Sequence, residues 1–61
     1  MNDIRVTRSR KGLREIVGKS DKGLKWLRDN IQGEGPFIIL DEHLDDMLIK
    51  FREGDLTVEV L

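Results

Sequence analysis

No cysteine occurs among the 61 residues of this chain, so neither a disulfide nor a cysteine-ligated zinc ion can hold its fold together. A domain of about 60 residues buries only about 60% of the surface that its unfolded chain exposes, which leaves a narrow margin of stability. Such a chain needs either very regular packing or self-association, and self-association is the commoner solution. We therefore expect residues 1–61 to form one small domain that gains stability from a second copy.

Alternation and apolar runs predict three strands and one helix. Residues 3–7 and 56–60 alternate between polar and apolar side chains, which is typical of short strands with one exposed face. Residues 37–40, FIIL, are apolar at every position, which predicts a central strand covered on both faces. Residues 42–53 should form a helix that ends at Gly54. Its apolar stripe consists of Leu44, Met47, Leu48 and Phe51.

Two similar segments predict a further pair of helices. SRKGLREI, which starts at Ser9, is followed eleven residues later by SDKGLKWL, which starts at Ser20. In each segment the leading serine can accept a free N–H of a first helical turn. We therefore expect helices at roughly 10–17 and 21–31.

Glycines and one aspartate mark contacts and boundaries of the predicted helices. Gly12 and Gly23 occupy equivalent places in the two segments. A helical glycine costs up to about 1 kcal/mol relative to alanine, which indicates that another element packs closely at both positions. We expect Gly18 and Gly33 to end the two helices and Asp41 to cap the third.

The resulting order of elements is β-α-α-β-α-β. It predicts an α+β domain in which a three-stranded sheet carries three helices. Because strand–helix–strand units normally join parallel strands, the run 37–40 should pair with the last strand and lie in the middle of the sheet.

The charges are distributed unevenly along the chain. Residues 1–33 hold nine basic and four acidic residues, a net charge of +5, whereas residues 34–61 hold two basic and eight acidic residues, a net charge of −6, which together give the formal charge of −1. This asymmetry fits two halves that face each other, within one chain or across a dimer. It also fits a basic surface that contacts nucleic acid.

The stretch GKSDKG at residues 18–23 contains the Gly-Lys-Ser with which a phosphate-binding P-loop ends. That loop requires four residues between its first glycine and this tripeptide, whereas five separate Gly12 from Gly18. We interpret the stretch as a corner between two elements, with Ser20 as the cap of the following helix.

A corner between two helices is also compatible with a helix-turn-helix motif, whose second helix enters the DNA major groove. With Gly18 in the turn, the apolar positions of the motif fall on Leu13, Val17, Leu24 and Leu27. However, Arg14 replaces the usual small residue and Lys19 replaces the usual buried one. In this alternative the helix pair 10–31 is a DNA- or RNA-binding regulator that uses Arg8, Arg10, Lys11, Arg14, Lys22, Lys25 and Arg28.

The sequence predicts no catalytic, metal or cofactor site. On a helix, His43 faces away from the neighbouring acids of DEHLDD (41–46), so these residues do not converge on one ion. A chain this short leaves little room for a desolvated pocket. No apolar run approaches the ~20 residues that span a bilayer and no signal peptide is visible, so we expect a cytoplasmic protein that does not enter the membrane.

Two apolar residues break the helical pattern. Trp26 lies away from the centre of its apolar stripe, and Ile49 lies on the acidic side of its helix. Trp26 fits either an interface or ordinary core that lies over neighbouring chain. Because tryptophan is enriched at interface hot spots, we predict a non-enzymatic regulatory or interaction protein that forms a homodimer and binds a protein partner. The expected partner-binding residues are Trp26, Lys22, Lys25, Arg28 and Ile49.

Overall fold

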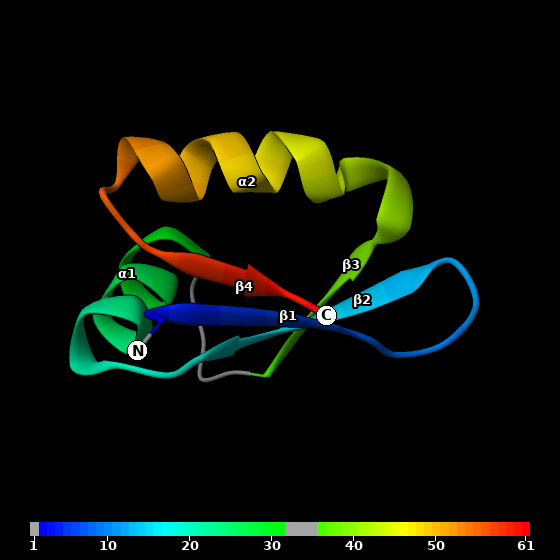
Figure 1. Cartoon of the computed structure of the whole chain (residues 1–61), viewed down its shortest axis with the longest axis horizontal. Helices are drawn as coiled ribbons and strands as arrows, with labels where there is room; N and C mark the ends of the chain where they lie inside the picture. The colour runs from blue at the N-terminus through cyan, green and yellow to red at the C-terminus, as the bar shows by residue number, and fades with distance from the viewer. Residues whose placement is uncertain (1, 32–35) are drawn as a thin grey trace.

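Four strands and two α-helices make up the part of the chain that the computed structural model describes, residues 2–31 and 36–61 (Figure 1). The order is β1 (Ile4–Arg8), β2 (Leu13–Gly18), α1 (Asp21–Ile31), β3 (Phe37–Leu40), the 3₁₀ helix η1 (Asp41–His43), α2 (Leu44–Glu53) and β4 (Val58–Val60). The predicted α+β class is confirmed. The predicted count of three strands and three helices is wrong, because the segment expected to form the first helix is strand β2.

The sheet is mixed, and its strand order is β3-β2-β1-β4. Strand β2 pairs antiparallel with both β1 and β3, and β4 pairs parallel with β1. Strand β3 is therefore an edge strand, and the predicted central position of residues 37–40 is wrong. The predicted pairing of β3 with β4 is also wrong, since these two strands lie at opposite edges.

A tight turn, and not a helix, follows β1. The N–H of Leu13 donates to the carbonyl of Arg10 (2.8 Å), and Gly12 has a φ of 79°, a conformation that L side chains rarely adopt. Ser9 does not cap a helix, since its N–H donates to the carbonyl of Leu13 (3.2 Å). Beyond the turn, Ile16 pairs with Val6, and both are fully buried. The hairpin thus replaces the predicted helix at 10–17. Gly12 sits in its turn, where a Cβ would meet nothing within 4 Å, so the predicted close packing at this glycine is wrong.

The corner at GKSDKG joins a strand to a helix. Gly18 ends β2 and not a helix. The N–H of Gly23 donates to the Ser20 hydroxyl (3.0 Å), which confirms Ser20 as the cap of α1. The predicted close packing at Gly23 is confirmed as well, because a Cβ there would lie 2.1 Å from the carbonyl oxygen of Asp3. The predicted helix stop at Gly33 lies outside the described residues.

Both helices pack on the same face of the sheet. Register places Ile4, Val6 and Ile16 on this inner face, where they meet the side chains of α1 and α2. The buried core consists of Ile4, Val6, Ile16, Leu27, Leu44, Phe51 and Leu56. The stripe of α2 is confirmed, since Leu44 and Phe51 are buried and Met47 and Leu48 pack against the core. No helix of the described chain covers the opposite face.

The ends of α2 follow the prediction only in part. Gly54 follows its last residue, as expected. Asp41 is not a cap, because its carboxylate accepts a hydrogen bond from Nε of Arg14 (2.6 Å) and no side chain caps η1.

Candidate interaction surfaces

The open face of the sheet has an apolar strip along β3. Residues that are directly paired across strands project from the same face, so Leu13 and Leu40 lie side by side there, and Ile38 lies next to Glu15. Ile38 and Leu40 are 50% and 48% exposed, and Leu13 is half-buried. We call Leu13, Ile38 and Leu40 the outer strip.

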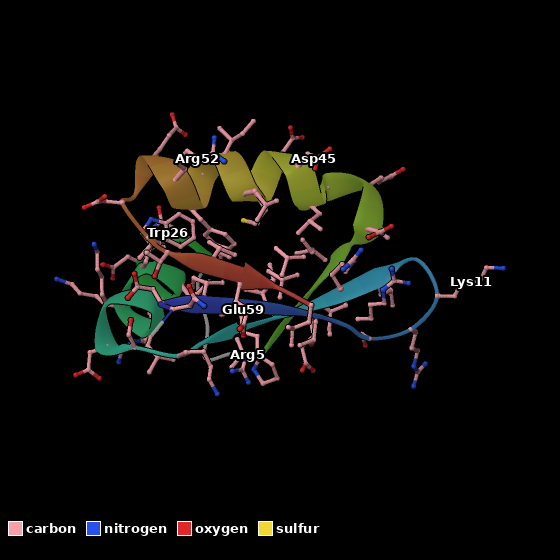
Figure 2. The ribbon with its side chains drawn as sticks, in the orientation of Figure 1. Arg5, Lys11, Trp26, Asp45, Arg52 and Glu59 are labelled. Carbon is pink, nitrogen blue, oxygen red and sulfur yellow. The ribbon has the colours of Figure 1, made fainter. Side chains whose placement is uncertain are left out.

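The other half of the open face is polar. Arg5 and Glu59 are paired across β1 and β4, and Nε of Arg5 lies 2.7 Å from Oε1 of Glu59 (Figure 2). Thr7, paired with Glu15, lies on the same face. The outer strip is therefore bordered by polar side chains: Glu15 of β2 lies next to Ile38, and the half of the face over β1 and β4 is polar.

Strand β3 combines the composition of a central strand with the position of an edge strand. Natural edge strands usually carry charges, proline or bulges that discourage further association. The other edge follows this rule, because β4 has three residues and Glu59 is at its centre. The four residues of β3 are all apolar. The apolar side chains of β3 on the open face are typical of a strand that another layer of structure covers.

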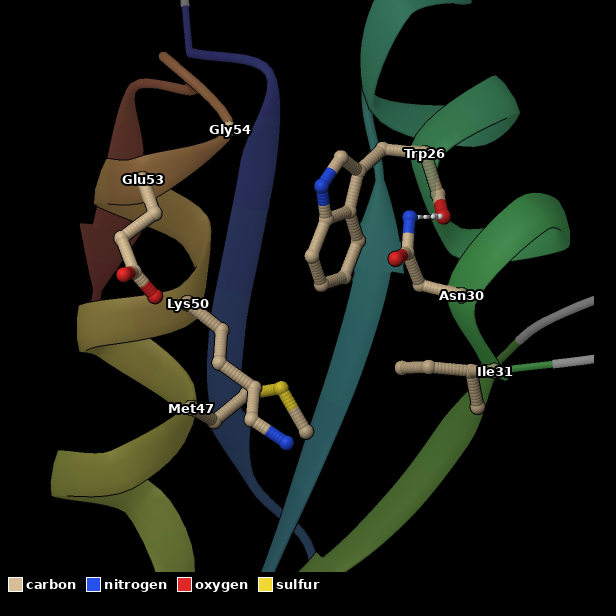
Figure 3. A pocket seen from close by; sticks show the side chains of 7 residues that line it. All are labelled: Trp26, Asn30, Ile31, Met47, Lys50, Glu53 and Gly54. Atoms are coloured by element: carbon tan, nitrogen blue, oxygen red, sulfur yellow. Dashed lines mark hydrogen bonds between the residues drawn. The ribbon is translucent and has the colours of Figure 1, made fainter.

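Trp26, a predicted partner-binding residue, packs between the two helices. Its ring meets that of Phe51 edge to face, with centroids 5.1 Å apart and planes at 70°. The indole is half-buried and forms one wall of a groove of about 530 Å³ between α1 and α2 (Figure 3). A Cβ at Gly54 would lie 2.5 Å from Nε1 of Trp26, so the glycine gives the indole its room.

The other predicted partner-binding residues are distributed over both helices. Lys22 is engaged within the chain, since Nζ donates to the carbonyl of Asp55 (2.6 Å). Lys25 and Arg28 are exposed on α1, and Ile49 is 55% exposed on α2. Contact of these residues with a partner stays a prediction.

The cations that sequence assigned to nucleic-acid binding fall into two groups. The turn between β1 and β2 lies at one end of the long axis, where Lys11 projects, and α1 lies toward the other end (Figures 1 and 2). The predicted helix pair of a helix-turn-helix motif is wrong, because residues 13–18 form β2, whereas nucleic-acid binding stays a prediction. The group in the hairpin is Arg8, Arg10, Lys11 and Arg14, and the group on α1 is Lys22, Lys25 and Arg28.

The hairpin end of the molecule carries both signs of charge. Arg8 and Arg14 are directly opposite each other in the hairpin, which places two like charges side by side. Asp41 offsets one of them through its 2.6 Å contact with Arg14, and the N–H of Asp41 donates to the carbonyl of Gly12 (2.8 Å). The first residue of η1 therefore lies against the basic turn. A hollow of about 400 Å³ is lined by residues 8–14 and by Asp41.

A junction around Asp3 fastens the N-terminal segment, α1 and β4 together. Its carboxylate accepts hydrogen bonds from the Ser20 hydroxyl (2.6 Å) and from the N–H of Thr57 (3.0 Å). These two bonds, that of Ser20 first, hold the pKa of Asp3 below its ordinary value. Since the Ser20 hydroxyl both donates to Asp3 and accepts from Gly23, we interpret the junction as structural. Sequence reasoning identified the cap but missed Asp3, whose partners are distant in the chain.

Metal ligands do not gather in the described ranges: no three His, Asp or Glu side chains of residues 2–31 and 36–61 are close enough to hold an ion. His43 lies 3.4 Å from the carboxylate of Glu42 alone. Neither described helix has the length and apolar character needed to cross a membrane.

Comparison of the chain with protein-family models, with curated proteins and with solved structures found no match. What the protein does has to be argued from its own surfaces.

Proposed function

We propose that this protein is a non-enzymatic interaction protein that works as a homodimer, and that two copies pack the β2–β3 halves of their open sheet faces together. The observation that supports this is the outer strip, in which Ile38 and Leu40 are about half exposed on a strand with no charge. Sheets that pack face to face lie about 10 Å apart and bury the apolar side chains between them.

A two-fold contact of this kind has the usual anatomy of a protein interface. The outer strips of the two copies would form an apolar centre, and the polar half with the Arg5–Glu59 pair would form a solvated rim. Pairing along the free edges of β3 would leave Ile38 and Leu40 largely exposed. The strip therefore favours face contact over edge pairing.

The expected dimer is weak. Fully burying a Leu or Ile side chain contributes about 1.5–3 kcal/mol, so burying the exposed halves of Ile38 and Leu40 in both copies contributes about 3–6 kcal/mol. The loss of translational and rotational freedom costs at least about 4 kcal/mol. The sum of these two terms is close to zero, so the rim has to supply most of the affinity, and the dimer should form only at high protein concentration.

Light scattering coupled to size exclusion, over a range of concentrations, tests this proposal. Ile38→Lys/Leu40→Lys should be folded and monomeric at concentrations where the unmodified protein is a dimer, because two lysines per copy would be buried in the contact. Ile49→Lys is the matched control, since Ile49 is equally exposed but lies on α2. Loss of the dimer in the Ile49 variant alone would move the interface to the helix layer and refute the assignment. A wild-type monomer at every concentration would refute the homodimer.

A further inference from the structure

We infer that the hairpin end is a second, charge-driven contact between copies of this chain, separate from the sheet-face contact. Two features define it. The basic turn is Arg8, Arg10 and Lys11, and the acidic start is Glu42, Asp45 and Asp46. This contact uses a different surface from the proposed dimer. Salt should weaken it, whereas salt should not weaken the sheet-face contact.

The two features lie next to each other because the fold fastens them together. Asp41 begins η1, contacts Arg14 through its carboxylate at 2.6 Å, and donates its N–H to the carbonyl of Gly12 in the turn. Figure 1 shows η1 and the start of α2 toward the same end of the molecule as the turn. Strand order, and not sequence proximity, brings residues 8–11 and 42–46 to one place.

The charges of this end are not neutralised within the described chain. The ion pairs of residues 2–31 and 36–61 include no carboxylate within 4.0 Å of Arg8, Arg10 or Lys11. They likewise include no cation close to Asp45 or Asp46, both of which are exposed. The Arg14–Asp41 bridge joins the two features at their base, and of the acidic start only Glu42 has a basic neighbour among the described residues, Nε2 of His43 at 3.4 Å.

A second copy complements this arrangement by symmetry. A two-fold axis through the hairpin end places the basic turn of each copy against the acidic start of the other, so each attraction occurs twice. In this arrangement each basic turn faces an acidic start of the other copy, so like charges do not face each other in the contact. Electrostatic complementarity of this kind fixes orientation more than it raises affinity.

Nucleic acid fits the same end less well. The acidic start would face the phosphates as soon as the turn approached them. Helix α1, whose cations could extend a basic surface, lies toward the other end of the molecule (Figure 1). The net charge of the whole chain, −1, also disfavours binding to negatively charged nucleic acid.

A charge-swap experiment tests the inference. The acidic variant is Arg10→Glu/Lys11→Glu, and the basic variant is Asp45→Lys/Asp46→Lys. Each variant alone should associate less than wild type, because its own two features now have the same sign. An equimolar mixture should associate more tightly than either variant alone, because each basic feature again meets an acidic one. Sedimentation velocity with one variant labelled measures all three combinations.

Controls separate this contact from the sheet-face dimer. Lys50→Glu/Arg52→Glu makes the same charge change as the acidic variant in the last turn of α2, away from the hairpin end, and it should leave association unchanged. Raising salt from low to molar concentration should weaken the end contact about tenfold or more, whereas the apolar sheet contact should not weaken. If Asp45→Lys/Asp46→Lys does not fold, Asp45→Asn/Asp46→Asn should still show weakened association.

Two results would overturn the inference. In the first, the mixture associates no more tightly than the separate variants, which is what the sheet-face dimer alone predicts. In the second, wild type binds a duplex DNA probe, the basic variant binds it more tightly, and the mixture shows no gain in association. The turn would then be a phosphate contact and not a contact between copies.

Discussion

Replacing Gly23 by alanine should destabilise the protein even though alanine is the better helix former. In an exposed helix the exchange would gain up to about 1 kcal/mol, and somewhat less in a first turn. Gly23, however, lies in the first turn of α1 against β1, where a Cβ would be 2.1 Å from the carbonyl oxygen of Asp3 and 3.3 Å from Cδ1 of Ile4. An ordinary contact at this position needs 3.4 Å or more, so backbone has to move by over an ångström.

The expected change in the free energy of unfolding follows from the contacts that this movement disturbs. The start of α1 is held to the N-terminal segment by the bond from Ser20 to the Asp3 carboxylate (2.6 Å) and by that from the N–H of Lys19 to the Asp3 carbonyl (2.7 Å). Weakening these two bonds costs about 1 kcal/mol each, and forcing extra volume into a packed contact costs about 1–3 kcal/mol more. After the gain in propensity is subtracted, Gly23→Ala should lower the free energy of unfolding by about 2–4 kcal/mol.

Urea denaturation followed by Trp26 fluorescence and by circular dichroism measures this loss. A domain of this size has a total stability of only about 3–9 kcal/mol, so the midpoint should fall sharply. Gly12→Ala is the matched control: a Cβ there meets nothing within 4 Å, and only the φ of 79° is unfavourable, at a cost of about 1–2 kcal/mol. A Gly23→Ala protein as stable as wild type, or more stable than the Gly12→Ala protein, would refute the close approach of α1 and β1.

Two further predictions concern the Asp3 junction and the helix layer. The lowered pKa of Asp3 means that its ionised form stabilises the fold, a contribution that is complete above about pH 4 and is lost as pH falls through the folded-state pKa. Asp3→Asn should therefore reduce thermal stability near neutral pH, and its difference from wild type should shrink in acid; a difference that persists unchanged in acid would contradict this assignment. Trp26→Ala should lower the free energy of unfolding by about 2–4 kcal/mol, since it removes the edge-to-face contact with Phe51, yet leave the sheet-face dimer intact in light scattering at concentrations where the variant is folded. Loss of the dimer without loss of stability would instead support Trp26 as an interface residue.

The fold class and helix α2 could be predicted from sequence, the helix because its pattern allows one periodicity only. The stripe of α2 repeats at helical spacing over two turns, and its end at Gly54 follows from that residue. Strand β2 is different, because Leu13, Ile16 and Val17 fit both a helical face and a short strand. Pairing with β1, together with the positive φ of Gly12, decides between them. Sequence similarity to the segment at Ser20 favoured the wrong choice.

The charged end could be predicted only as two separate halves of the chain. Counting charges shows a basic N-terminal half and an acidic C-terminal half. That Arg14 and Asp41 meet depends on β3 pairing with β2, which places residues 27 positions apart within 2.6 Å. No local pattern contains that information. The same holds for Asp3 and Thr57, whose hydrogen bonds span 54 positions.

The error about β3 supports the proposed dimer. The composition of residues 37–40 predicts cover on both faces, and within one copy the helices supply cover on one face alone. If β3 stayed exposed at the edge of the sheet, selection for solubility should place a charged residue at position 38 or 40. Both side chains are about half exposed, so a charge at either position would not disturb the core. The apolar side chains at positions 38 and 40 are consistent with a further layer of structure over the open face, which the described part of one copy of the chain does not supply. A second copy over the outer strip would give β3 the environment that its sequence specifies.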